Sequence, residues 1–193
     1  GGVGRTLATF VSAQLVLYIA VGALVPSIPL YCQELGLGEL GQGVVISAPA
    51  VTMLALANAS GRAADRWGRK PALTAGLGVI ACGDLLTALS TGLPTLLPGR
   101  LIVGAGRIAS ETAERAMLAD LGDRAPERRG RILAWNQLAV SAGFVVGPAL
   151  GGWLTENYGA TSTWYCVSAA SAFCFAFFTA LLPETGEAGG APR

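Results

Sequence analysis

Residues 61–70 read Gly-Arg-Ala-Ala-Asp-Arg-Trp-Gly-Arg-Lys and separate two long apolar stretches. Gly61 and Gly68 permit a tight turn, because glycine adopts positive φ without steric cost. Asp65 can accept hydrogen bonds from exposed backbone amides or pair with an arginine one helical turn later. Pro71 follows at once and suits the first turn of a new helix. The segment therefore predicts a short basic turn between two helices. A simple topology anchor, the alternative, would need the cations but neither the glycines nor the aspartate.

The apolar stretches are long enough to cross a membrane, which takes about 20 mostly apolar residues. Charged residues make up only 13% of the chain and hydrophobic residues 52%. The stretches lack both the polar face of a surface helix and the period-two alternation of a strand. We therefore predict an all-α bundle of six transmembrane helices in one domain, residues 1–183, with residues 184–193 starting a flexible tail or linker. The predicted helices span approximately 7–31, 43–61, 71–90, 94–118, 132–155 and 162–182.

The cations between these stretches all fall on one side of a six-span topology. The opposite loops, at residues 34–42, 91–93 and 156–161, contain no lysine or arginine. By the positive-inside rule, both termini of this multi-pass integral membrane protein face the cytoplasm or its equivalent in an organelle. The cations on that side are Arg5, Arg62, Arg66, Arg69, Lys70, Arg124, Arg128, Arg129, Arg131 and Arg193.

Composition argues against several other classes of protein. The net charge of +1 provides no long-range field for nucleic acid, and the chain lacks histidine, the commonest metal ligand. None of the four cysteines forms a C-x-x-C pair, so we expect neither a metal site nor a disulfide framework. No phosphate-binding loop is present, and a serine triad requires histidine, so we expect no cofactor and no catalytic residue. The first apolar stretch is as long as the later ones, which argues against a cleavable signal.

Residues 61–70 resemble the signature loop of the major facilitator superfamily, in which glycines, an aspartate and a basic run join the second and third helices. The resemblance implies the N-terminal six-helix half of a transporter, similar to multidrug and proton-antiporter members and built as 3+3 inverted repeats. It also implies that Asp65 engages the N-terminus of a helix in a second half when the cytoplasmic side closes, where a carboxylate is favourable. The gating-loop residues that the resemblance implies are Gly61, Asp65, Arg66, Gly68, Arg69 and Lys70.

Two further patterns extend the resemblance along the chain. Residues 100–106 resemble the family's R-x-x-x-G-x-G stretch, which in proton-coupled members places the arginine in the cavity. The chain then departs from the family, with Arg107 and Ile108 where small residues are usual. Residues 143–152 match a pattern associated with antiporters, although glycines four apart also fit a simple packing seam, and proline can kink a helix. The residues of this pattern are Gly143, Gly147, Pro148, Gly151 and Gly152.

Charges at bilayer depth cost about 2.5–3.5 kcal/mol each on insertion scales and therefore usually face a cavity. At 100° per residue, Arg100, Arg107, Glu111 and Glu114 fall within roughly 60° of one another, with Arg115 on the flank. We expect this stripe to face the bundle interior, either as a polar track for substrate or protons or as a self-neutralised ladder of i,i+4 pairs. The ladder is favoured for Glu114 and Arg115, and a functional role for Arg100.

Asp84 is the sole carboxylate between residues 71 and 90. It lies about as far before the turn at residues 91–92 as Arg100 lies after it. In an antiparallel hairpin the two side chains would match in depth. We therefore expect Asp84 either to pair with Arg100 or to serve as a protonatable site.

The first predicted helix carries no carboxylate, whereas many proton-coupled drug exporters of the family carry one there. Its candidates for substrate contact are Gln14, Tyr18 and Tyr31. Pro26 and Pro29 are expected to break this helix near its outer end, where a binding site or gate often lies.

The sequence therefore predicts a secondary transporter of small organic solutes that works by alternating access, with proton-coupled efflux of drugs or metabolites favoured. The candidates for the cavity and for proton coupling are Arg100, Asp84, Arg107 and Glu111. Two alternatives stay open: an uncoupled metabolite or sugar facilitator, and a half-length membrane protein that assembles with a partner without transporting. The expected partners are a small-molecule substrate, protons, the lipid bilayer and a second six-helix half, from the same full-length chain or another copy.

Overall fold

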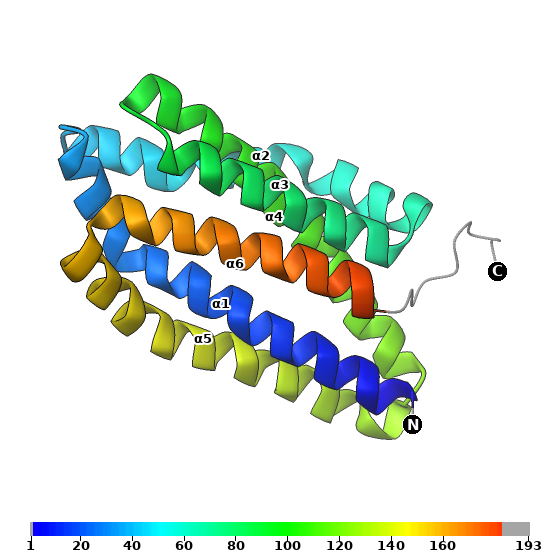
Figure 1. Ribbon diagram of the computed structural model, residues 1–193. Coiled ribbons are helices and arrows are strands. Elements are labelled where there is room, and N and C mark those ends of the chain that lie inside the picture. Colours follow the sequence, from blue (N-terminus) through cyan, green and yellow to red (C-terminus); the bar gives the residue numbers. More distant parts are fainter. Residues whose placement is uncertain (1, 183–193) are drawn as a thin grey trace.

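Six long helices lie side by side in one bundle in the computed structural model, which describes residues 2–182 (Figure 1). The helices are α1 (Gly2–Glu34), α2 (Glu39–Trp67), α3 (Arg69–Ala88), α4 (Leu93–Asp123), α5 (Arg129–Tyr158) and α6 (Ala160–Leu181), with a 3-10 turn, η1 (Pro126–Arg128), before α5. No strand occurs in this described part of the chain, which confirms the predicted all-α class. Arg193 and the predicted tail at residues 184–193 lie outside the described residues.

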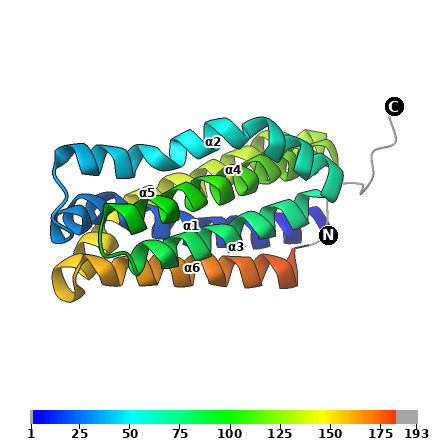
Figure 2. The same ribbon diagram turned by 90° about the horizontal axis from the view of Figure 1, so that it is seen from above.

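Five of the six helices are long and apolar enough to cross a membrane, and α4 is the exception. α4 lies alongside the others but carries charged residues from Arg100 to its end at Asp123. It packs against α3 and α2 and more weakly against α5 (Figure 2). Arg100 and Glu114 are buried in this packing, whereas Arg107, Glu111 and Arg115 stay partly or largely exposed. Charge at membrane depth usually faces the bundle interior or a cavity.

The predicted basic turns lie together at the end of the bundle where α1 begins (Figure 1). We call this the basic end, and its cations are Arg62, Arg66, Arg69, Lys70, Arg124, Arg128, Arg129 and Arg131. The chain turns between α2 and α3 over the single residue Gly68, whose φ of 100° favours glycine. The prediction for Gly61 was wrong, because α2 continues through it to Trp67 and no turn is needed there.

The expected break in α1 at Pro26 and Pro29 was also wrong, because the helix continues through both prolines to Glu34. Proline is tolerated in membrane helices when neighbouring helices and hydroxyl side chains satisfy the local polar groups. Ser27 lies between the prolines and donates a 2.9 Å hydrogen bond to the Ala23 carbonyl. Its hydroxyl also lies 2.9 Å from that of Thr155 on α5, so tertiary contacts support this part of α1.

Glycines of α5 allow its backbone to lie directly against α1. A Cβ atom at Gly147 would lie 2.6 Å from the Ile19 carbonyl oxygen, and Gly143 and Gly151 are similarly blocked by α1. Gly152 does not belong to this seam, since a Cβ there would meet nothing within 4 Å. The prediction that Gly152 packs with the others fails because it lies 100° further around the helix than Gly151.

A second close contact joins α4 to α2. Gly104 of α4 lies against the backbone of Pro49 in α2, just as Gly22 of α1 lies against the turn containing Pro148 in α5. The pair α1–α5 thus resembles the pair α4–α2, and α1–α6 likewise corresponds to α4–α3. These contacts are consistent with the 3+3 repeat that the sequence resemblance implies.

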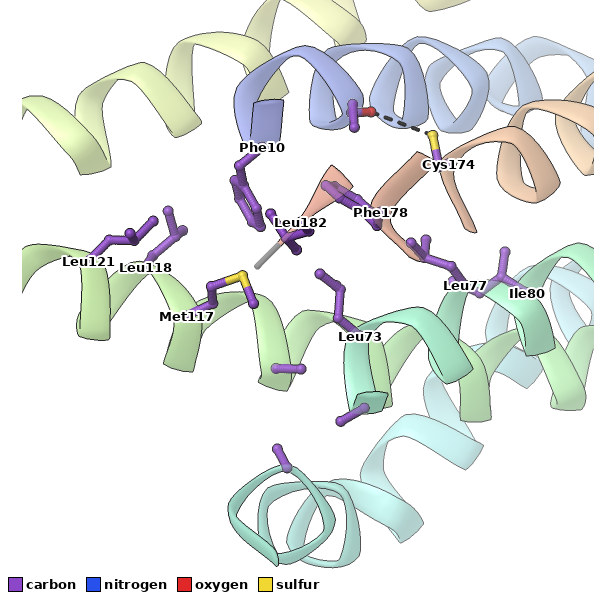
Figure 3. Packing of buried hydrophobic residues seen from close by; sticks show 14 of the residues in the cluster. Phe10, Leu73, Leu77, Ile80, Met117, Leu118, Leu121, Cys174, Phe178 and Leu182 are labelled. Atoms are coloured by element: carbon purple, nitrogen blue, oxygen red, sulfur yellow. Dashed lines mark hydrogen bonds between the residues drawn. The ribbon is translucent and has the colours of Figure 1, made fainter. Parts of the chain in front are cut away.

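Two hydrophobic clusters hold the bundle together at different depths. The cluster nearer the basic end joins α1, α3, α4 and α6 around Phe10, Met117 and Phe178 (Figure 3). The other cluster surrounds Leu96 and Trp164. Asp84, Arg100, Arg107 and Glu111 fall between these clusters, whereas Glu114 and Arg115 lie at the depth of the cluster nearer the basic end.

We expect Gly147→Ala to destabilise the folded bundle and Gly152→Ala to leave it unchanged or stabilise it. The added methyl at residue 147 collides with α1 backbone, and such overpacking costs about 1–3 kcal/mol. At residue 152 the methyl has open space, and alanine is the better helix former by up to about 1 kcal/mol. Thermal unfolding in detergent measures both variants, and equal melting temperatures would contradict the packing seam.

Candidate functional site

The charged stripe of α4 borders a cavity of about 50 Å³ between α1, α3 and α4. This volume has room for a few water molecules but not for an organic solute. The cavity brings together all four predicted candidates for proton coupling, which come from α3 and α4. Its polar lining comprises Tyr18, Asp84, Arg100, Arg107, Ser110, Glu111 and Glu114.

Asp84 of α3 and Arg100 of α4 meet in the buried part of this region. Their similar distances from the turn at residues 91–92 predicted this contact. The Asp84 Oδ1 and Arg100 Nη1 atoms are 3.9 Å apart, and the side chains are 2% and 8% exposed. Close approach of the helices permits this pair, because a Cβ at Gly83 would lie only 3.0 Å from the Gly99 carbonyl oxygen. Neither of the two paired atoms has a hydrogen-bond partner among the described residues, so the pair is a loose electrostatic contact.

Aromatic residues complete the surroundings of Arg100. Its guanidinium carbon lies 5.2 Å from the centroid of the Trp164 ring, within the range of a cation–π interaction. The Tyr31 ring packs on the Trp164 ring at a centroid distance of 5.7 Å. The Tyr31 hydroxyl donates a 2.7 Å hydrogen bond to the Thr87 carbonyl. Tyr31, a predicted substrate contact, is thus buried and engaged in packing between helices. Trp164 was missed because nothing in the sequence links α6 to Arg100.

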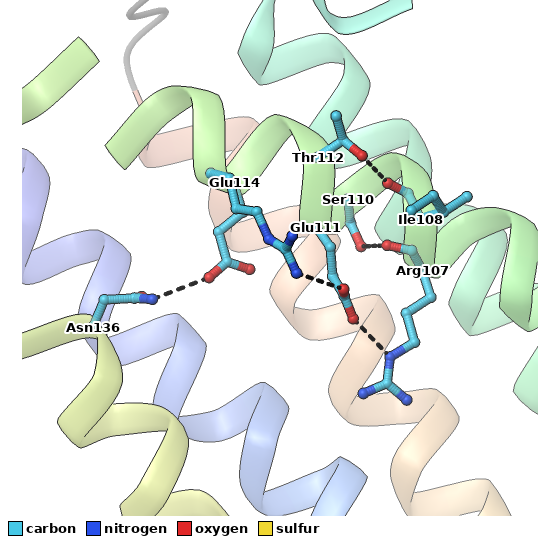
Figure 4. A network of polar contacts seen from close by, with 8 residues as sticks. Arg107, Ile108, Ser110, Glu111, Thr112, Glu114 and Asn136 are labelled. Atoms are coloured by element: carbon cyan, nitrogen blue, oxygen red, sulfur yellow. Dashed lines mark hydrogen bonds and ion pairs between the residues drawn. The ribbon is translucent and has the colours of Figure 1, made fainter. Parts of the chain in front are cut away.

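Glu111 forms ion pairs with the other two arginines of the stripe, Arg107 and Arg115. Its Oε1 atom lies 2.9 Å from Arg107 Nε, and its Oε2 atom lies 3.6 Å from Arg115 Nη2 (Figure 4). Both contacts are the i,i+4 pairs that helical periodicity predicts. The ladder alternative therefore describes this part of α4 well.

Glu114 lies apart from that ladder and is directed toward α5 (Figure 4). Its Oε1 atom accepts a 3.2 Å hydrogen bond from Asn136 Nδ2, and the residue is 8% exposed. Gln14, a predicted substrate contact on α1, lies near the same carboxylate and is 1% exposed. Asn136 was not anticipated, because the contact joins residues from two different helices.

A larger cavity of about 520 Å³ adjoins this carboxylate between α1, α4 and α5. Tyr18, the third predicted substrate contact, borders both this cavity and the smaller one. The other residues lining the larger cavity are Glu114, Arg115, Leu118, Leu133, Ala134, Asn136, Gln137 and Val140. This cavity is large enough for a small organic molecule, for which sites of about 300–1,000 Å³ are typical.

The predicted gating loop lies at the basic end, away from both cavities. Arg69 links three helices, with its Nε atom 3.2 Å from Asp120 Oδ2 of α4 and its Nη2 atom 3.7 Å from Asp65 Oδ1 of α2. The Asp65 side chain is 74% exposed, so its carboxylate is accessible for a further contact. Arg66 is exposed and Lys70 is half-buried, while Gly68 makes the turn itself. Asp120 was not identified from the sequence as part of this cluster.

No group of three His, Cys, Asp or Glu side chains suited to a metal ion occurs among residues 2–182. The four cysteines are free; Cys32 and Cys174 are buried, and Cys82 and Cys166 are exposed. The described residues offer one buried ion pair, Asp84–Arg100, the partly exposed contacts of Glu111, and an organic-sized cavity.

Two multidrug and quinolone resistance proteins are similar to this chain in sequence. The chain is 26% identical over 151 residues to multidrug resistance protein 1 of Bacillus subtilis, which covers 78% of this chain and 38% of the relative. It is 22% identical over 140 residues to the quinolone resistance protein NorA of Staphylococcus aureus, covering 72% of this chain and 36% of the relative. The chain thus matches well under half the length of these relatives.

Solved transporter structures have the same fold. The human organic anion transporter MFSD10 (TETRAN) superposes with a TM-score of 0.78 at 22% identity, over 97% of this chain and 49% of that one. A peptide transporter, POT, solved with sulfate, gives 0.79 at 16% identity, over 91% of this chain and 37% of that one. The family model described as the Major Facilitator Superfamily matches residues 10–193. This protein is therefore a member of the major facilitator superfamily of membrane transporters.

Proposed function

We propose that the full-length protein is a secondary transporter of small organic solutes that works by alternating access, with this chain as one half. The proposal rests chiefly on the charged residues of α4, of which Arg100 and Glu114 are buried beside the cavity between α1, α3 and α4. Charge in that position costs several kcal/mol on insertion scales and commonly marks the pathway of a substrate or ion. Family membership and the names of the drug-resistance relatives support the same function.

A second six-helix half would complete the pathway by covering α2 and α5. These are the least buried of the five apolar helices, and they expose large apolar side chains such as Leu54 and Val145. Asp65 offers an exposed carboxylate that the positive N-terminus of a helix in the second half can accept. The second half belongs to the same full-length chain or to another copy.

Proton-coupled efflux is the favoured subtype, and Asp84 is the favoured proton site. Asp84 is buried, borders the small water-sized cavity, and pairs only loosely with Arg100. Protonation of Asp84 would cancel that attraction and release Arg100 for other contacts, which links proton uptake to a rearrangement of α3 and α4. The uncoupled facilitator and the non-transporting half-length protein are the alternatives that transport measurements separate.

Proteoliposomes containing the full-length protein and an internal pH-sensitive dye test the transport function. We expect solute flux that depends on a pH gradient when a panel of organic cations, anions and sugars is supplied. Flux that does not depend on the pH gradient would support an uncoupled facilitator. No flux of any solute would support a non-transporting protein that assembles with a partner. Empty liposomes provide the background.

Asp84→Asn should abolish substrate-driven proton movement, because an amide cannot take up the proton. The same change leaves Arg100 buried without its counter-charge, which typically costs about 3–5 kcal/mol. A double variant, Asp84→Asn with Arg100→Gln, removes both charges and should restore folding but not coupling.

The control for this experiment is Asp123→Asn, at an exposed carboxylate of the basic end that lies 3.3 Å from Arg129. It should leave coupling intact. Unchanged proton movement in the folded Asp84→Asn protein would exclude Asp84 as the proton site.

The cytoplasmic position of the basic end can be tested by labelling. Single cysteines introduced at Lys70 and Arg129, in a background without exposed native cysteines, should react with a membrane-impermeant maleimide only after cells are opened. Reaction of either residue in intact cells would contradict the proposed orientation.

A further inference from the structure

The carboxylates around the α4 stripe differ in how their charge is balanced. Asp84 is paired with Arg100, and Glu111 is paired with Arg107 and Arg115. No cationic group lies within 4 Å of the Glu114 carboxylate in the part of the chain that the structure describes. Glu114 is therefore a buried carboxylate without a direct ion pair, although Arg115, which contacts Glu111, borders the same cavity.

The Glu114 carboxylate is contacted by an uncharged group, and Arg115 is the one cation among the residues that line the larger cavity. Asn136 donates one hydrogen bond to the carboxylate, and its own Oδ1 atom is buried with no donor among the described residues. Gln14 lies close by, yet its Nε2 atom makes no hydrogen bond of good geometry there. Arg115 borders the same cavity, but its side chain is 80% exposed and its guanidinium contacts Glu111 instead.

The 520 Å³ cavity beside Glu114 has both apolar and polar lining residues, which suit an amphipathic molecule. Leu118, Leu133 and Val140 supply apolar surface along it. Tyr18 supplies an aromatic ring, held by the Phe144 ring at a centroid distance of 5.7 Å. Aromatic faces and a desolvated carboxylate both attract organic cations, and apolar walls accept the rest of such a molecule.

We infer that Glu114 is the charge-selecting residue of a binding site for a monovalent organic cation, formed by α1, α4 and α5. The cation supplies the direct ion pair that no side chain of the described residues makes with Glu114. Its apolar body occupies the cavity against the Tyr18 ring, and the Asn136 amide positions the carboxylate. This inference rests on the proposed transport function and assigns Glu114 a role different from that of Asp84, which has a built-in cation.

Equilibrium binding of tetraphenylphosphonium and tetraphenylborate to the full-length protein in detergent tests the site. The two ions match in size and shape but carry opposite charges. Wild-type protein should bind the cation in preference to the anion. Glu114→Gln should weaken cation binding by about tenfold or more, because it removes the attracting charge from a poorly solvated site.

Glu111→Gln is the matched control, since it makes the same chemical change on the same helix, at a carboxylate already neutralised by two arginines. It should change cation binding by less than about threefold, as expected for a partly exposed and compensated charge. Equal losses in the two variants, no loss in folded Glu114→Gln, or no cation preference in wild-type protein would each overturn the assignment.

Protection of a cysteine at position 137 provides a second measurement that does not depend on the folding of Glu114→Gln. Gln137 is exposed and lines the same cavity. In the Gln137→Cys protein, tetraphenylphosphonium should slow maleimide labelling above the background of the native cysteines, and tetraphenylborate should not. Equal labelling rates with and without the cation would count against the site.

Failure of the binding site and failure of transport give different results. Gradient-dependent flux of anions or neutral solutes without cation binding would overturn the Glu114 assignment while the transport function stands. Cation binding that is lost in Glu114→Gln, in a protein that shows no flux, would support the site and contradict the transporter.

Discussion

Hydrocarbon cannot solvate charge, and the rest of this structure depends on how the charges of α4 are enclosed. α4 is the one helix of the described bundle that is not apolar enough to qualify as a membrane span by its own composition. It lies at membrane depth because α2 and α3 pack against it and because apolar clusters lie on either side of the part of its polar stripe from Arg100 to Glu111. The stability of α4 is therefore a tertiary property, whereas the other helices suit lipid by themselves.

Small residues make this enclosure possible. Gly83 and Gly99 bring α3 and α4 together closely enough for Asp84 to reach Arg100. Gly147 and its neighbours bring α5 equally close to α1. Without a hydrophobic driving force between helices in lipid, such backbone contact supplies much of the association. The glycines thus serve packing and the functional site at once.

Two buried carboxylates with different surroundings underlie the two roles that we propose for this chain. Asp84 has an arginine beside it and a cavity of only about 50 Å³, which suits the gain and loss of a proton. Glu114 has no such cation, and it borders a cavity about ten times larger. A transporter that exchanges protons for a solute needs both a proton site and a solute site. Asp84 lies on α3 and Glu114 on α4, and Arg100, the partner of Asp84, lies on the same helix as Glu114, so α4 would connect the two sites.

Helical periodicity and residue type were enough to predict the six helices, the one-sided basic turns, and the Arg107–Glu111–Arg115 contacts, because these are properties of local spacing. The depth match of Asp84 and Arg100 was also predictable, since a tight hairpin sets the alignment of its two helices. The contacts of Trp164, Asn136 and Asp120 were not predictable, because they join helices that are distant in sequence. The continuity of α1 through Pro26 and Pro29 was not predictable either. Proline usually breaks a helix, but contacts with neighbouring helices support α1 there. What the sequence by itself determined was which segments enter the membrane and which charges share a face of α4. Only the tertiary structure decided which of those charges acquire partners, because that depends on how closely neighbouring backbones approach.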